Sequence, residues 1–115
     1  MDYLIRVKTA NVICAGTDRD VYIVMVGESG KESPKFEMTE RIPGNALERN
    51  ADEKFTVKCD DIGRIVKIKL SKDKTDDWEC EFIEITRSEV ARNPESVFHV
   101  NACITGSHTK EFIVS

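Results

Sequence analysis

The fold is decided by the segment Cys14-Ala15-Gly16-Thr17-Asp18-Arg19-Asp20-Val21-Tyr22-Ile23, in which a small-residue turn leads into the most apolar strand-like run of the chain. Gly16 tolerates the backbone conformations of a tight turn, and Thr17 and Asp18 can hydrogen-bond the turn backbone. Residues 21–26 are apolar at both parities, as in a central strand covered on both faces. We predict a ligand-facing loop on a β scaffold, although the local pattern fits a purely structural turn at least as well.

Seven further segments have the residue pattern of short strands. Apolar and polar side chains alternate in most of them, and glycine, proline or charged residues separate one segment from the next. The eight predicted strands are residues 3–9, 21–26, 35–39, 55–59, 64–70, 78–85, 97–100 and 111–114. Because no amphipathic helix or internal repeat interrupts them, they predict an all-β, antiparallel sandwich. The alternation changes phase at Phe82-Ile83, which predicts a bulge there.

Composition limits the classes of function. A chain of 115 residues with 40% hydrophobic and 33% charged residues is expected to form one domain over residues 1–115. Its formal net charge of −4 argues against a general nucleic-acid binder, and its apolar runs are too short to cross a bilayer. The cysteines Cys14, Cys59, Cys80 and Cys103 form no Cys-x-x-Cys pair. Cys59 and Cys80 fall at apolar positions of strand-like runs, so we predict buried free thiols in a reducing, cytoplasmic compartment.

Several motifs occur together in an order and spacing typical of one family. They are the opening Tyr3 with Val7 and Thr9, then Ala15-Gly16-Thr17-Asp18 before Val21-Tyr22-Ile23, Leu47-Glu48-Arg49, Phe55-Thr56-Val57, Ile62-Gly63, Ile68-Lys69-Leu70, Asp73 and Trp78. This set resembles the PLAT domain of polycystins, lipoxygenases and bacterial alpha-toxin, from Tyr3 to about Ile85 and more weakly from Phe98 to Ile104. The resemblance implies an eight-stranded sandwich of two four-stranded sheets that is not itself an enzyme and that docks on lipid or on another protein.

The resemblance also implies three loops at one end, residues 11–20, 41–46 and 72–77, where several members bind calcium. The residues at matching calcium-loop positions are Gly16, Asp18, Gly44, Asn45 and Asp73. Cys14, Arg41, Ile42 and Ala46 depart from the oxygen-bearing residues of calcium-binding members, and Cys103 stands where tryptophan is common. Calcium requires six to eight oxygen ligands, so we expect one position between Gly16 and Asp73, with weak calcium binding or none.

The same three loops carry bases and aliphatic residues, which predicts docking on anionic membrane lipids from outside the hydrocarbon. The predicted lipid-binding residues are Val12, Ile13, Arg19, Arg41, Lys72 and Lys74. Each base near an anionic leaflet contributes about 1 kcal/mol, and the aliphatic side chains add insertion into the interface. In the alternative interpretation these are solvated loop charges, and Val12 and Ile13 pack down on the body of the domain.

Two other interpretations remain open at this stage. Trp78 alternates with Cys80 and is expected to pack in the core, although a lipid-inserting role is the alternative. The chain also fits a protein-interaction module that uses the 28–36 hairpin edge or the 87–96 loop. Nothing near His99 or His108 supplies a nucleophile, a base and an orienting group in order, so we predict no catalytic activity.

Overall fold

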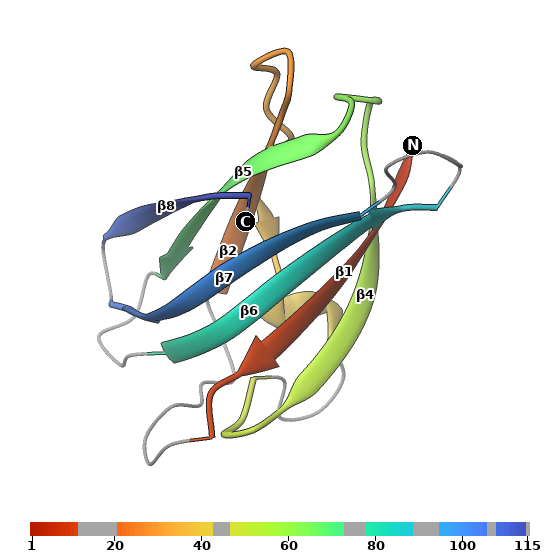
Figure 1. Ribbon diagram of the computed structural model, residues 1–115. Helices are drawn as coiled ribbons and strands as arrows, with labels where there is room; N and C mark the ends of the chain where they lie inside the picture. The colour runs from red at the N-terminus through yellow and green to blue at the C-terminus, as the bar shows by residue number, and fades with distance from the viewer. Residues whose placement is uncertain (12–20, 43–46, 73–77, 89–94, 106–107, 115) are drawn as a thin grey trace.

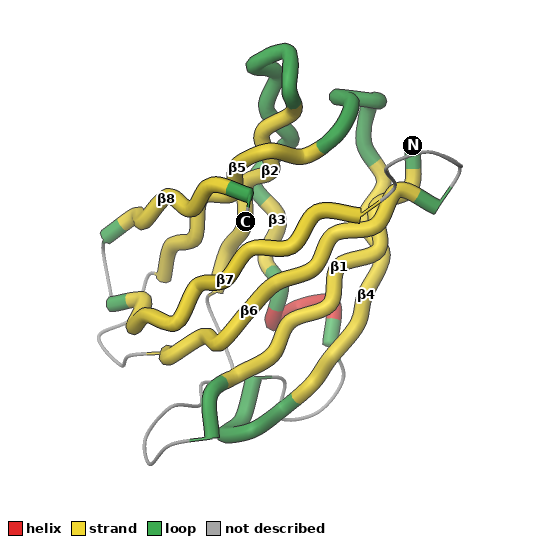
Figure 2. Tube along the Cα trace, viewed as in Figure 1, coloured by secondary structure: helices red, strands yellow, loops and turns green. Residues whose placement is uncertain are grey.

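The computed structural model describes residues 1–11, 21–42, 47–72, 78–88, 95–105 and 108–114, which form two antiparallel sheets (Figure 1). One sheet has the strand order β4-β1-β6-β7 and the other β3-β2-β5-β8. The strands are β1 (Asp2–Thr9), β2 (Val21–Gly27), β3 (Phe36–Glu37), β4 (Asp52–Lys58), β5 (Ile65–Lys72), β6 (Trp78–Arg87), β7 (Glu95–Ile104) and β8 (Thr109–Ile113). A short 3-10 turn, η1 (Thr39–Arg41), follows β3 (Figure 2). The predicted all-β sandwich of two four-stranded sheets is confirmed.

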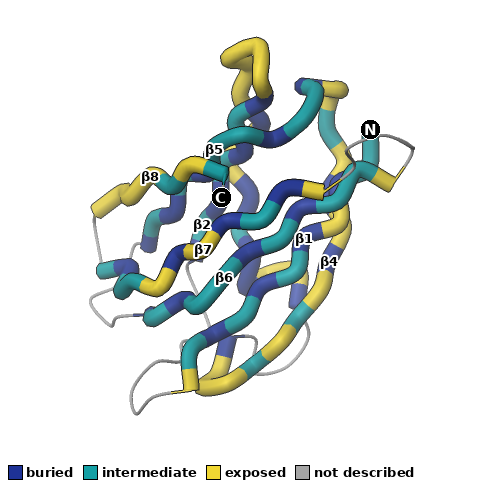
Figure 3. Tube along the Cα trace, in the orientation of Figure 1, coloured by how far each residue is buried: buried dark blue, intermediate teal, exposed yellow. Residues whose placement is uncertain are grey.

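The core lies between the two sheets and is built by alternation. Tyr3, Ile5 and Val7 of β1 are fully buried, and so are Ile23 and Met25 of β2, while the residues between them are more exposed. Figure 3 shows the same alternation of buried and exposed positions along the strands. Because successive side chains of a strand point to opposite faces, this pattern fixes the register of the strands against the core.

A bulge interrupts β6 close to the predicted place. The pairing of β6 with β7 shifts between Cys80 and Phe82, and its pairing with β1 shifts at the same level. Trp78 and Cys80 face the core before the shift, whereas Ile83 and Ile85 face it afterwards. The extra residue therefore changes the phase of the strand, as a bulge does, and turns Phe82 to the outer face.

The connection from β4 to β5 crosses close over the end of β2. A Cβ atom added to Gly27 would lie 1.8 Å from the carbonyl oxygen of Ile62. The hydroxyl of Tyr3 accepts a hydrogen bond from the Ile62 N–H at 3.1 Å and donates one to the Gly63 carbonyl at 3.3 Å. Glycine at position 27 thus permits a contact that holds this connection against both sheets.

Strand ends differ in places from the sequence expectation. β5 and β7 extend beyond the predicted 64–70 and 97–100, whereas β3 is shorter than 35–39 because the chain turns into η1. The segment 111–114 corresponds to β8, which begins two residues earlier, at Thr109. Within the described part of the chain, no helix is long and apolar enough to cross a membrane.

Candidate functional site

The strand ends next to two of the three predicted loops, residues 11–20 and 72–77, lie together at one end of the sandwich. Val21, which opens β2, pairs with Lys72, which closes β5, and Lys8 near the end of β1 pairs with Asp52 at the start of β4. Thr9 pairs with Cys80 near the start of β6. We call this the loop end, and the opposite end, where β1 begins, the far end (Figure 1). The segments 11–20 and 73–77 are therefore attached at the loop end.

Trp78 closes the core at the loop end. Its side chain is fully buried, and its indole Nε1–H donates a hydrogen bond to Thr9 Oγ1 over 2.9 Å. Buried indole groups need such a partner, because an unpaired buried N–H is costly. The core-packing interpretation of Trp78 is thus confirmed, and insertion of this ring into lipid is excluded by its place between the sheets.

Arg41 lies on the flank of the sandwich, at the end of η1. Its side chain is exposed, and the guanidinium carbon lies 5.0 Å from the centre of the Phe36 ring. Arg41 and Lys54 of β4 line a shallow groove of about 550 Å³ together with Glu40, Phe55 and Thr56. The groove therefore presents two cations and one carboxylate to solvent, a balance that suits an anionic ligand.

Lys72 does not lie where its predicted contact with lipid headgroups would require. It is fully buried at the end of β5, on the inward-facing parity of Ile68 and Leu70. Its ammonium cannot reach a headgroup in solvent without moving out of this position. Among the predicted lipid-binding residues that the structure describes, Arg41 is exposed and Lys72 is not.

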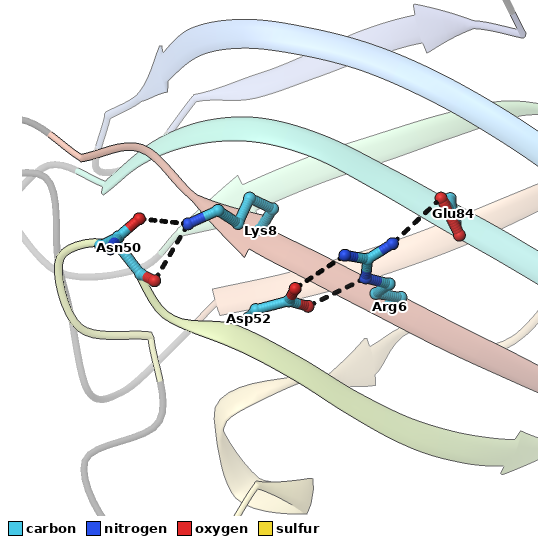
Figure 4. A network of polar contacts seen from close by, with 5 residues as sticks. All are labelled: Arg6, Lys8, Asn50, Asp52 and Glu84. Atoms are coloured by element: carbon cyan, nitrogen blue, oxygen red, sulfur yellow. Dashed lines mark hydrogen bonds and ion pairs between the residues drawn. The ribbon is translucent and has the colours of Figure 1, made fainter.

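A polar network fixes the start of β4 to β1 on the outer face of the sheet (Figure 4). Arg6 donates two hydrogen bonds to Asp52, at 2.9 and 2.7 Å, and one to Glu84 at 3.4 Å. Lys8 bonds both the backbone and the side-chain oxygen of Asn50. The Arg6 guanidinium also lies 5.0 Å from the centre of the Phe82 ring. This network sets the direction from which the chain enters β4 at the loop end.

Replacement of Asp52 by Asn is expected to flatten the pH dependence of stability in acid. Hydrogen bonds from Arg6 hold the pKa of Asp52 below its ordinary value of 3.8. A carboxyl with a depressed pKa contributes stability above the unfolded value, and that contribution is lost as the pH falls through the folded value. Urea unfolding measured between about pH 6 and about pH 2 checks this expectation.

Arg6→Met is a second variant that tests the same contact. It removes the other partner of the same contact, so it should flatten the profile like Asp52→Asn. The double variant should then add little to either single change. An Asp52→Asn profile as steep as that of the wild type below pH 3.8 contradicts the assignment.

The thiols and histidines of the described residues do not resemble a catalytic centre. Burial raises the pKa of the Cys80 thiol strongly and that of Cys59 as well, which disfavours the reactive thiolate. His99 is exposed on β7, opposite Phe82, and His108 is exposed before β8. Cys59 is only half-buried, whereas Cys80 is buried as predicted.

Most of the predicted metal and lipid positions fall outside the described residues. These are Val12, Ile13, Gly16, Asp18, Arg19, Gly44, Asn45, Asp73 and Lys74. In the part of the chain that the structure describes, no group of three or more His, Cys, Asp or Glu residues is placed to hold a metal ion. The sequence interpretation missed Lys54, although its outward parity beside Phe55 and Val57 could have indicated an exposed base.

Comparison with known proteins identifies the family. The family model of the PLAT/LH2 domain matches residues 3–114. The chain belongs to the PLAT/LH2 domain family. This PLAT/LH2 chain is 35% identical over 86 residues to the Lipoxygenase homology domain-containing protein 1 of Mus musculus, a match that covers 72% of the chain and 4% of that protein. The chain thus spans a small fraction of that relative.

Solved structures share the PLAT/LH2 fold. Coral 8R-lipoxygenase, described as activated by calcium through a C2-like domain, superposes with a TM-score of 0.85 at 23% identity, covering 100% of this chain and 17% of the lipoxygenase. A calcium-dependent 11R-lipoxygenase superposes with a TM-score of 0.75 at 21% identity, covering 99% and 17%. At these identities the likeness establishes the fold alone.

Proposed function

We propose that this PLAT/LH2 domain is a non-catalytic module that docks on anionic phospholipid headgroups through its loop end and the flank groove that Arg41 and Lys54 line. The observation that carries the proposal is the gathering of the strand ends Thr9, Val21, Lys72 and Trp78 at one end of a closed core. That arrangement lets segments far apart in the sequence meet one flat surface together.

The proposal assigns the headgroup contacts to Arg19, Arg41, Lys54 and Lys74, and the insertion to Val12 and Ile13. Arg41 and Lys54 already share a groove on the flank of the sandwich. Each base held near an anionic surface contributes about 1 kcal/mol, so four of them suffice for reversible binding. Lys72 is left out of this set because it is buried. A cytoplasmic location remains a prediction.

Reversal of two of these charges tests the proposal. The double variant Arg19→Glu with Arg41→Glu is expected to weaken binding to phosphatidylserine vesicles at least about thirtyfold, because two attractions become repulsions. Co-sedimentation in chelator and in calcium, with phosphatidylcholine vesicles as the neutral reference, measures this effect.

Lys31→Glu with Lys58→Glu is the matched control. It changes the net charge by the same amount at the far end, where both side chains are exposed. We expect this control to bind vesicles as the wild type does. Absence of wild-type binding in both calcium and chelator, or equal losses in the two double variants, overturns the proposal.

A protein-interaction module is the second candidate function, and one groove favours it. At the far end, a groove of about 470 Å³ lies between the hairpin residues 31–34 and the segment 58–62. It borders the 28–36 hairpin that the sequence indicated as a docking edge. Under this alternative, the far-end control variant loses a protein partner, and the loop-end variant keeps it.

A further inference from the structure

We propose that the flank groove, which Glu40, Arg41, Lys54, Phe55 and Thr56 line, binds an acidic, extended segment of a partner protein. The segment adds to β4 as an outer strand and places its carboxylates beside Arg41 and Lys54. It therefore competes with lipid for these two bases, and that competition rests on the proposed function. Peptide binding itself is tested in solution without a membrane, so failure of the two proposals can be told apart.

The pairing of β4 is the first observation that carries the inference. β4 is an outer strand of its sheet, with β1 as its neighbour, and the register between them is unbroken along the whole strand. Beyond one end of this register, the Thr9 N–H donates to the Ala51 carbonyl at 2.9 Å. Beyond the other end, the Cys59 N–H donates to the Met1 carbonyl at 3.2 Å. In an antiparallel ladder every second residue pair exchanges hydrogen bonds, so these two bonds fix which residues of β4 bond β1.

The same alternation decides which backbone groups of β4 face the groove. Counted inward from either bond, Glu53, Phe55 and Val57 exchange hydrogen bonds with β1. The backbone N–H and C=O groups of Lys54 and Thr56 therefore point away from β1, and no described residue bonds them. Both residues line the flank groove. The groove thus contains an open sheet edge, which is the template that an added strand pairs with.

The charges of the groove favour an acidic strand. On the other sheet, Lys67 and Lys69 each hold a carboxylate, at 2.6 and 2.9 Å. Arg41 and Lys54, by contrast, form no ion pair with another described residue. The contact of Arg41 with the Phe36 ring limits the positions that its guanidinium takes. Both bases are therefore available to a partner of opposite charge.

A run of acidic residues suits these bases because they belong to different layers. Lys54 has the parity of Asp52, which bonds Arg6 on the outer face of the sheet (Figure 4). Arg41 belongs to η1, which follows β3 of the opposite sheet. Successive side chains of a strand point to opposite faces, so neighbouring carboxylates can meet the two bases in turn. A lipid headgroup can meet the same charges, but the alternating donors and acceptors of the open edge match a peptide backbone.

A peptide titration tests the inference. The full chain is titrated against a fluorescein-labelled peptide of about eight glutamate and valine residues, long enough to span β4, and anisotropy is followed. We expect saturable binding by the wild type. The double variant Arg41→Gln with Lys54→Gln should bind at least about tenfold more weakly, because both attractions are lost. Glu40→Gln should bind about threefold more tightly, because the groove loses its carboxylate.

Lys31→Gln with Lys110→Gln is the matched control, since it removes the same charge from exposed positions outside the groove. It should bind the peptide as the wild type does. A second peptide, methylated at its backbone nitrogens, keeps the carboxylates but cannot donate to β4, so it should bind at least about tenfold more weakly. Bound parent peptide should also slow hydrogen exchange of the Lys54 and Thr56 amides at least about tenfold.

Three results overturn the inference: no saturable binding by the wild type, equal affinity of the double variant and the wild type, or equal affinity for the methylated peptide. The last result would mean a contact between charges alone. Vesicle co-sedimentation without peptide tests the proposed function separately. Where vesicles bind, saturating peptide should lower that binding. Vesicle binding that the peptide leaves unchanged contradicts the competition and the assignment of this groove to headgroups.

Discussion

Replacement of Trp78 by Ala is expected to lower the free energy of unfolding by about 4 kcal/mol. Trp78 is fully buried at the loop end, so alanine leaves a large cavity there. The change also leaves Thr9 Oγ1 without the indole donor that now lies 2.9 Å away. Urea unfolding at neutral pH measures the loss, which is a large part of the stability of a domain of this size.

Two smaller substitutions distinguish the free-energy cost of the cavity from that of the lost hydrogen bond. Trp78→Phe keeps much of the ring volume but loses the N–H, and Thr9→Val removes the acceptor with little change of shape. Each is expected to cost about 1–2 kcal/mol, and the double variant less than their sum, because both break one bond. A cost of under about 1 kcal/mol for Trp78→Ala contradicts the assignment of this ring to the core.

The second large effect is expected at Gly27, on the far end. Gly27→Ala should lower the free energy of unfolding by about 3 kcal/mol, since the new Cβ would lie 1.8 Å from the Ile62 carbonyl oxygen. The clashing atom belongs to the backbone, so the clash is relieved only if the β4–β5 connection moves. That movement disturbs the Ile62 N–H bond to the Tyr3 hydroxyl. Chemical denaturation and the exchange rate of the Ile62 amide report the two consequences.

Gly30→Ala is the control for this prediction. Gly30 has a φ of +90° but no atom within 4 Å of an added Cβ, so only backbone strain is at stake. A cost of about 1 kcal/mol is expected there, clearly below that at Gly27. Equal costs at the two positions would mean that the close approach of Ile62 to β2 is not present in solution.

Much of the fold could be predicted because it depends on local alternation. The alternation of Phe55 with Val57 and the phase change after Cys80 were sufficient to place β4 and the bulge in β6. The predicted strand 97–100 was too short, since β7 continues through Asn101, a residue with positive φ, to Ile104. Pairing with β6 extends that strand. The residue pattern of one strand alone does not show which strand it pairs with.

The candidate site was less predictable, for reasons seen at Lys72 and Arg41. The sequence interpretation places Lys72 in the loop of residues 72–77 as a base that meets lipid, yet the parity of Ile68 and Leu70 already indicates that Lys72 lies on the inner face. That interpretation relies on the charge of Lys72 and not on its position in the alternation of β5. The contact of Arg41 with Phe36 and its groove with Lys54 depend on tertiary packing between η1, β3 and β4. No spacing in the sequence contains that information.

The two ends of the sandwich differ, and this difference affects how many linked copies of the domain can bind one surface. β1 begins opposite Lys58 and β8 finishes opposite Lys67, so the first strand starts and the last strand ends away from the loop end. Polypeptide that continues from either strand in a longer chain leaves the tip unobstructed. Copies of such a unit, tethered through that side, can engage one surface at the same time, and a second weak contact then forms at a high effective concentration. Avidity of this kind lets modest contacts at each tip add up to durable attachment.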